Sequence, residues 1–241
     1  MTEKKLRDYL KKDYEQPRGQ TILVPVVLSG SKGLRLKREV KCTVECSIVW
    51  WCKAGATIEN RITWLKENIK GKLRLLGSIR LYVWLGTCNK NVISKDKNGY
   101  ISLTTHPDQA LDHLISHYNQ IIDILKPYPN CKITILDVPV YSIYTYNLKK
   151  KHKEPEKFND QDTQLLDVIS TLNTRSKEIN KRLQTCSPNW SRDLYSNTKH
   201  RSRIRILYNL NLYEDGLHPK PLLAKVWLRK LAQHIKSHCW I

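Results

Sequence analysis

Residues 21–33 read TILVPVVLSGSKG and combine a short apolar run with a turn of small residues. The β-branched run 21–28 predicts a buried strand, with Pro25 favouring a bulge or a strand end. The turn 29–33 precedes a stretch with helical spacing, so Ser31 is expected at a strand-to-helix turn, where a helix N-terminus offers N–H groups to an anion. The turn matches neither a G-x-S-x-G motif nor a phosphate-binding P-loop. An ordinary helix-capping turn is the alternative.

The alternation of strand and helix continues along the chain. Further strands are predicted at 47–52, 80–85, 132–138 and 203–208, and helices at 58–70, 107–126, 160–183 and 221–236. Strands connected in this way form a parallel sheet with helices on both faces. We therefore expect a single α/β domain over residues 21–241, a three-layer α/β/α sandwich with a five-stranded parallel sheet of flavodoxin-like type. Residues 1–20 are charged throughout and are expected to be a poorly ordered leader.

The stretch Asp215-Gly216-Leu217-His218 lies between the last predicted strand and the last predicted helix. An Asp three residues before a His can accept the Nδ1 proton, which leaves Nε2 free to act as a base. Because D-x-x-H is a common pattern, a helix-entry Asp beside an exposed His is the alternative. Open parallel sheets bind ligands at the carboxyl ends of their strands, where both this turn and Ser31 are expected. Their shared position favours nucleophilic catalysis by Ser31, His218 and Asp215.

Two other predicted strands are followed by residues that suit an oxyanion hole. Gly55 follows strand 47–52 and would present an unobstructed N–H, and Asn89 follows strand 80–85 and carries a side-chain amide. Each residue alone is typical of a plain turn. The fixed order of Ser, Gly, Asn and Asp-x-x-His, each after a strand, favours the catalytic interpretation.

These four blocks resemble the SGNH (GDSL-type) serine hydrolases over residues 21–236. The resemblance implies an SGNH-hydrolase-like fold and a serine esterase that cleaves an acyl or acetyl ester, of a small molecule or a lipid, through an acyl-enzyme. Ser31 would be the nucleophile, His218 the base and Asp215 its orienting partner, with Ser31, Gly55 and Asn89 as oxyanion donors and no cofactor.

The chain departs from the SGNH pattern at two places. Gly30 replaces the Asp that usually precedes the nucleophile, and Asn89 lies three residues after Gly86 instead of two. These departures leave open a weakened enzyme or an inactive one. Stretches 50–58, 85–89 and 212–227 are also similar to SGNH-like proteins of invertebrate mobile elements.

Apolar runs and cysteines bear on the compartment. No apolar run reaches the roughly 18 residues of a membrane span, and the charged N-terminal stretch is unlike a secretory signal. Seven cysteines, an odd and scattered set, are typical of a reducing compartment. We therefore expect an intracellular protein, cytoplasmic or nuclear.

A metal site is not expected from the sequence. His234 and His238 have i, i+4 spacing with Cys239 adjacent, but no Glu follows His234 as in a zincin motif, and no C-x-x-C pair occurs. Polar surface residues near the end of the chain explain the pattern better.

The net charge of +20 predicts a surface that attracts polyanions. One concentration of charge, KKKHK at 149–153, supplies the nucleic-acid candidates Lys149, Lys150, Lys151 and Lys153. A simply solvated lysine-rich surface is the alternative. The competing function is therefore an inactive SGNH-fold module that binds nucleic acid or an anionic surface nonspecifically, encoded by a mobile element.

Overall fold

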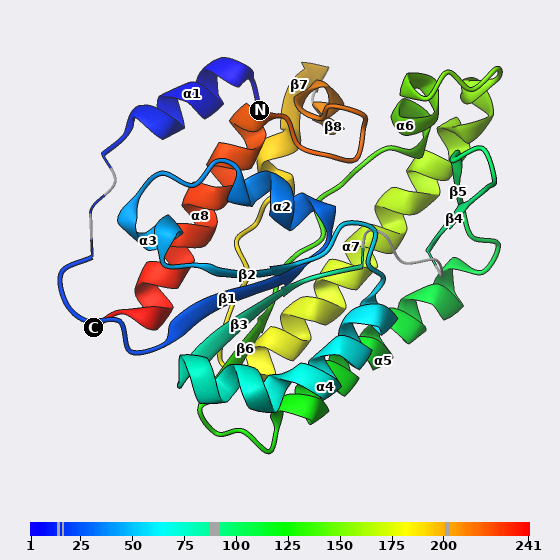
Figure 1. Cartoon of the computed structure of the whole chain (residues 1–241). Helices are drawn as coiled ribbons and strands as arrows, with labels where there is room; N and C mark the ends of the chain where they lie inside the picture. Colours follow the sequence, from blue (N-terminus) through cyan, green and yellow to red (C-terminus); the bar gives the residue numbers. More distant parts are fainter. Residues whose placement is uncertain (14, 16, 87–91, 201–202) are drawn as a thin grey trace.

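The computed structural model describes residues 1–13, 15, 17–86, 92–200 and 203–241. Its centre is a parallel sheet of four strands in the order β2-β1-β3-β6 (Figure 1). These strands are β1 (Val24–Ser29), β2 (Val49–Cys52), β3 (Ile79–Trp84) and β6 (Cys131–Ile135). The inner strands are buried along nearly their whole length, which explains why they appear in the sequence as continuous apolar runs.

Helices cover both faces of the sheet (Figure 1). One face carries α2 (Ser31–Lys37), α3 (Thr43–Cys46) and α8 (Pro221–Cys239). The other carries α4 (Ile58–Leu76), α5 (Pro107–Leu125) and α7 (Asn159–Arg182). The predicted three-layer α/β/α architecture is therefore confirmed, and the large apolar side chains of all three layers form one core.

The predicted fifth strand does not join the sheet. Residues Arg203–Tyr208 form β8, which pairs antiparallel with β7 (Tyr195–His200) in a separate ribbon. Strands so near in sequence can satisfy their backbone hydrogen bonds with each other, whereas joining the sheet in parallel requires a crossover. A second small ribbon, which the sequence did not predict, consists of β4 (Ile93–Lys95) and β5 (Ile101–Leu103).

Short helical segments complete the chain. They are α6 (Ile143–Lys149) and the 3₁₀ turns η1 (Pro155–Phe158), η2 (Ser191–Leu194) and η3 (Leu210–Leu212). The helix α6 matters for the site, because it packs beside the turn that contains Asp215 and His218. A Cβ built on Gly216 would lie 2.8 Å from the Cβ of Thr145.

The N-terminal stretch, expected to be poorly ordered, contains helix α1 (Glu3–Lys11) packed against α8 (Figure 1). Leu6 of this helix is fully buried. The guanidinium of Arg229 donates to the carbonyls of Leu10 at 2.7 Å and Lys12 at 3.0 Å. One buried leucine and these capping hydrogen bonds account for the order of a segment that is otherwise charged.

Candidate active site

Ser31 is the first residue of α2 and follows the carboxyl end of β1. A hydrogen bond fixes the start of this turn to the neighbouring strand, because the Ser29 hydroxyl donates to the Trp84 carbonyl of β3 at 3.0 Å. Gly33 lets α2 approach the sheet closely, since a Cβ there would lie 2.6 Å from the Cβ of Ser29 and 2.7 Å from the Cys52 sulfur. The strand, the turn and a glycine-dependent contact thus determine where the Ser31 hydroxyl lies.

The structure brings Ser31, His218 and Asp215 together. Ser31 Oγ lies 2.9 Å from His218 Nε2, and His218 Nδ1 lies 2.7 Å from Asp215 Oδ2. An ionised carboxylate can only accept, so Nδ1 carries the proton and Nε2 accepts from the Ser31 hydroxyl. This is the hydrogen-bond order in which a serine can pass its proton to an imidazole.

The turn that carries Asp215 and His218 is rigidly held. Asp215 Oδ1 accepts from the backbone N–H groups of Leu217 at 3.0 Å and His218 at 2.8 Å. Gly216 has a φ of +84° and presses against α6, and its carbonyl accepts from the Ser142 N–H at 3.0 Å. A side chain at position 216 would be strained and would clash with α6. The glycine between Asp and His is therefore a requirement of this turn.

Hydrogen bonding controls the charge of Asp215. Burial by itself would raise the pKa of this carboxyl, but the His218 ring and the two backbone N–H groups outweigh it and lower the pKa from 3.8 to about 2. Asp215 is therefore ionised at neutral pH and can stabilise a positive charge that develops on His218.

An ion pair connects the serine helix to the Asp-His turn. Arg35 of α2 contacts Glu214, the residue before Asp215, at 2.6 Å. The sequence did not predict this pair, since nothing local links residues that lie far apart in the chain. The one hint in the sequence is that Arg35 follows Ser31 and Glu214 precedes Asp215, so that residues of opposite charge lie next to the two proposed catalytic segments.

A small pocket opens beside Ser31. The residues that line it are Ser29, Gly30, Ser31, Lys32, Ala56, Trp84, Leu85 and Gly86. Gly55, the predicted oxyanion donor, is exposed at φ +68° in the adjacent turn, and its neighbour Ala56 lines the pocket instead. The other predicted donor, Asn89, lies outside the described residues. Gly86, with a φ of +111°, lies two residues after the end of β3 and also lines the pocket.

The four candidate lysines lie at one end of α6. Lys149, Lys150, Lys151 and Lys153 are all exposed. Within the described part of the chain, none of the four forms an ion pair. They therefore present an unneutralised positive cluster to solvent.

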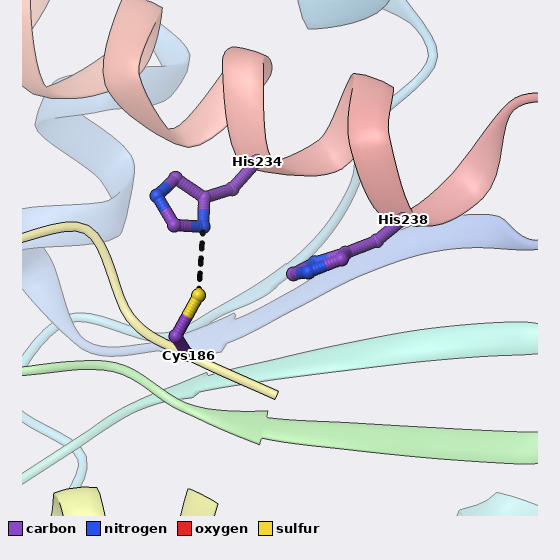
Figure 2. A group of neighbouring side chains, drawn as sticks. All are labelled: Cys186, His234 and His238. Carbon is purple, nitrogen blue, oxygen red and sulfur yellow. Dashed lines mark hydrogen bonds between the residues drawn. The ribbon is translucent and has the colours of Figure 1, made fainter. Parts of the chain in front are cut away.

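Two of the residues considered for a metal lie beside a third side chain that could bind one. His234 and His238 of α8 lie beside Cys186, and one ligand atom of each lies within 4.8 Å of the others (Figure 2). Cys239 instead places its sulfur 3.9 Å from the Tyr82 hydroxyl. The six cysteines of the described residues are all free thiols.

The helices of the described part of the chain include no candidate for a membrane span, because none combines the required length with the required apolar character.

No protein-family model and no curated protein matches the sequence. Solved structures do match. A GDSL-like lipase from Bacteroides thetaiotaomicron aligns with a TM-score of 0.58 at 14% identity, over 88% of this chain and 87% of that one.

Two other structures extend the comparison. An acetyl xylan esterase aligns with a TM-score of 0.55 at 11% identity, covering 87% of this chain and 98% of the esterase. The C-terminal catalytic domain of a Streptococcus pneumoniae peptidoglycan O-acetyltransferase aligns with a TM-score of 0.51 at 10% identity, over 90% and 95% of the two chains. The chain thus has the fold of the GDSL-like and SGNH hydrolases, as its sequence blocks predicted. The similarity to mobile-element proteins stays a prediction.

Proposed function

We propose that this protein is a serine hydrolase that cleaves ester bonds through an acyl-enzyme. The observation that carries the proposal is the hydrogen-bonded series from Ser31 Oγ through His218 to Asp215, with distances of 2.9 and 2.7 Å. The fold supports it, because the structural neighbours include a protein described as a lipase and another described as an esterase.

The reaction follows from the order of the hydrogen bonds. Ser31 Oγ attacks the ester carbonyl while its proton moves to His218 Nε2, and the ionised Asp215 stabilises the imidazolium that results. His218 then passes this proton to the departing alkoxide, so an alcohol leaves and an acyl group stays on Ser31. Water, deprotonated by His218, attacks the acyl-enzyme and releases the acid.

The oxyanion would be stabilised where α2 begins. The first N–H groups of a helix have no partner within it, and the N–H of Ser31 is the first of α2. We assign the Gly55 N–H and the Asn89 side chain as the other donors, on the strength of their positions after β2 and β3 in the sequence. Gly55 itself is exposed, and it is the next residue, Ala56, that lines the pocket beside Ser31. Replacing Asn89 with Ala should then lower kcat by on the order of a hundredfold with a smaller change in KM, whereas Cys88→Ala should change kcat little. An unchanged kcat in Asn89→Ala would remove Asn89 from the oxyanion hole.

A serine-directed fluorophosphonate probe tests the proposal directly. We expect it to label the wild type, and we expect Ser31→Ala to abolish both labelling and hydrolysis of p-nitrophenyl esters. Ser94→Ala is the matched control, since Ser94 is exposed on the β4–β5 ribbon. A panel of esters with increasing acyl length, run with the wild type, would define the acyl group. Retained labelling or retained turnover in Ser31→Ala would overturn the proposal.

A second candidate function rests on the exposed lysine cluster. An SGNH-fold module that binds nucleic acid without catalysis would use such a cluster to contact phosphates, and this binding would not depend on Ser31. The probe separates the two functions. A chain that binds RNA or DNA tightly at low salt and takes up no fluorophosphonate would favour the binding module.

A further inference from the structure

Cys186, His234 and His238 form a cluster of metal-ligating side chains outside the proposed active site. Cys186 lies in the segment between α7 and η2, while the two histidines lie one turn apart on α8 (Figure 2). The Cys186 sulfur is 3.9 Å from His234 Nδ1, and all three ligand atoms lie within 4.8 Å of one another. A sulfur and two ring nitrogens thus converge from two distant parts of the chain.

The donor set matches the chemistry of a transition metal. Zinc binds thiolate sulfur at about 2.3 Å and imidazole nitrogen at about 2.0–2.1 Å in a tetrahedral arrangement. Such bonds bring neighbouring ligand atoms to within roughly 3.3–3.8 Å of each other. Small side-chain rotations would therefore close the cluster around an ion.

The surroundings of His238 orient its ring. The Tyr82 hydroxyl lies 3.3 Å from His238 Nδ1. A hydrogen-bonding partner on one ring nitrogen orients an imidazole whose other nitrogen can bind a metal.

We propose that Cys186, His234 and His238 bind one divalent transition-metal ion, Zn²⁺ or an ion of similar softness, with water as the fourth ligand. Mixed thiolate and imidazole sets favour such ions over Mg²⁺ or Ca²⁺. Cys186 is exposed, which gives the ion a path from solvent and leaves space for the water. The Cys186 thiol loses its proton on coordination, and the resulting thiolate offsets the positive charge of Arg80, which donates to the neighbouring Thr185.

The position of the cluster indicates a structural ion. Arg80, the second residue of β3, donates to Thr185 at 3.3 Å, next to Cys186. The cluster therefore lies toward the amino ends of the strands, whereas Ser31 follows the carboxyl end of β1. An ion there would join the segment after α7 to the last turns of α8 and take no part in ester hydrolysis.

Co²⁺ is the probe for the test, because its absorption spectrum depends on the type and arrangement of the atoms that bind it. We expect untagged protein to bind one Co²⁺ per chain, with the visible bands of a tetrahedral ion and a near-ultraviolet sulfur-to-cobalt charge-transfer band. Zn²⁺ should displace the Co²⁺. Cys186→Ser should abolish the charge-transfer band, and His234→Ala should weaken binding at least about tenfold, since loss of a ligand costs more than loss of its hydrogen-bonding partner.

Matched variants control for surface binding. Cys46→Ser and His113→Ala replace exposed residues outside the cluster and should leave the Co²⁺ spectrum unchanged. Zn²⁺ should also raise the Tm of the wild type but not that of Cys186→Ser, because an ion that binds the folded state stabilises it. Circular dichroism would confirm that the variants are folded.

Two outcomes would overturn the proposal. One is the absence of stoichiometric Co²⁺ binding by the wild type. The other is a charge-transfer band that persists in Cys186→Ser. The result does not depend on whether Ser31 is catalytic, since neither readout involves ester turnover.

Discussion

Asp215 and Asp137 are carboxylates at the same edge of the sheet whose pKa values move in opposite directions. Hydrogen bonds lower the pKa of Asp215 to about 2 against the effect of burial. Burial raises the pKa of Asp137 to about 6, and Asp137 Oδ1 has no hydrogen-bond partner among the described residues. We therefore expect Asp→Asn substitutions at the two positions to change the free energy of unfolding in opposite directions at neutral pH.

Asp215→Asn should destabilise the protein at neutral pH. The folded-state pKa lies below the ordinary 3.8, so the ionised carboxyl stabilises the fold above about pH 4 and loses this effect as the pH falls toward 2. Allowing for solvent screening of a side chain that is 32% exposed, we expect a loss of about 1–2 kcal/mol at pH 7. Urea unfolding of both proteins between pH 7 and pH 3 measures it. A difference that does not shrink toward pH 3 would contradict this account.

Asp137→Asn should stabilise the protein at neutral pH. The folded-state pKa lies above the ordinary value, so the folded protein binds an extra proton between about pH 4 and 6 and becomes less stable as the pH rises through that window. Removing the buried charge should add about 1–3 kcal/mol to the free energy of unfolding at pH 8. The same urea titrations measure it, and the gain should vanish near pH 4. A variant less stable than wild type at pH 8 would show that Asp137 has a partner that needs its charge.

At the scale of the element, the contact between α2 and the sheet determines the position of Ser31. Gly33→Ala would place a methyl group 2.6 Å from the Ser29 side chain, inside the turn that carries Ser31. We expect a loss of about 1–3 kcal/mol of stability from overpacking, together with a fall in kcat as Ser31 moves away from His218. Thermal unfolding and ester kinetics measure the two effects.

Gly71→Ala is the control for that substitution. Gly71 lies in α4, and a Cβ there would meet no atom within 4 Å. This change should raise stability by about 0.5–1 kcal/mol, because alanine favours helix, and should leave kcat unchanged. If Gly33→Ala were as stable and active as Gly71→Ala, the close approach of α2 would not be what positions Ser31.

At the scale of the whole molecule, the net charge of +20 predicts attraction to polyanions. If phosphates bind at the end of α6, replacing Lys149, Lys150, Lys151 and Lys153 with Gln should weaken binding to RNA or DNA and flatten its log–log dependence on salt, since fewer counterions are released. Fluorescence anisotropy over a salt series measures both, and ester turnover should not change.

A variant with the same loss of charge spread over the surface provides the comparison. Lys66, Lys70, Lys97 and Lys126 are exposed and lie on other elements. If replacing these four with Gln reduces binding as much as the α6 set, the attraction comes from the overall charge and not from a local site. A complex insensitive to salt would exclude phosphate contacts as its basis.

Local sequence patterns predict the four strands of the central sheet, the long helices α4, α5, α7 and α8, and the two segments of the proposed active site. The run before Ser31 and the glycine within 215–218 are local signals, because hydrophobic periodicity and turn chemistry act over a few residues. Parallel strands align their carboxyl ends, which places Ser31, after β1, at the predicted edge of the sheet. The strand before Asp215 and His218 is β8, which lies outside that sheet, so the packing of the whole chain brings His218 to Ser31.

Which distant segments meet depends on the packing of the whole chain. Residues 203–208 have the composition of a strand, but backbone pairing with 195–200 takes them out of the central sheet. Cys186 joins two histidines 48 and 52 residues away, and Arg35 of α2 meets Glu214. Such contacts depend on how layers pack and strands pair over the whole chain, and no window of sequence a few residues long contains that information.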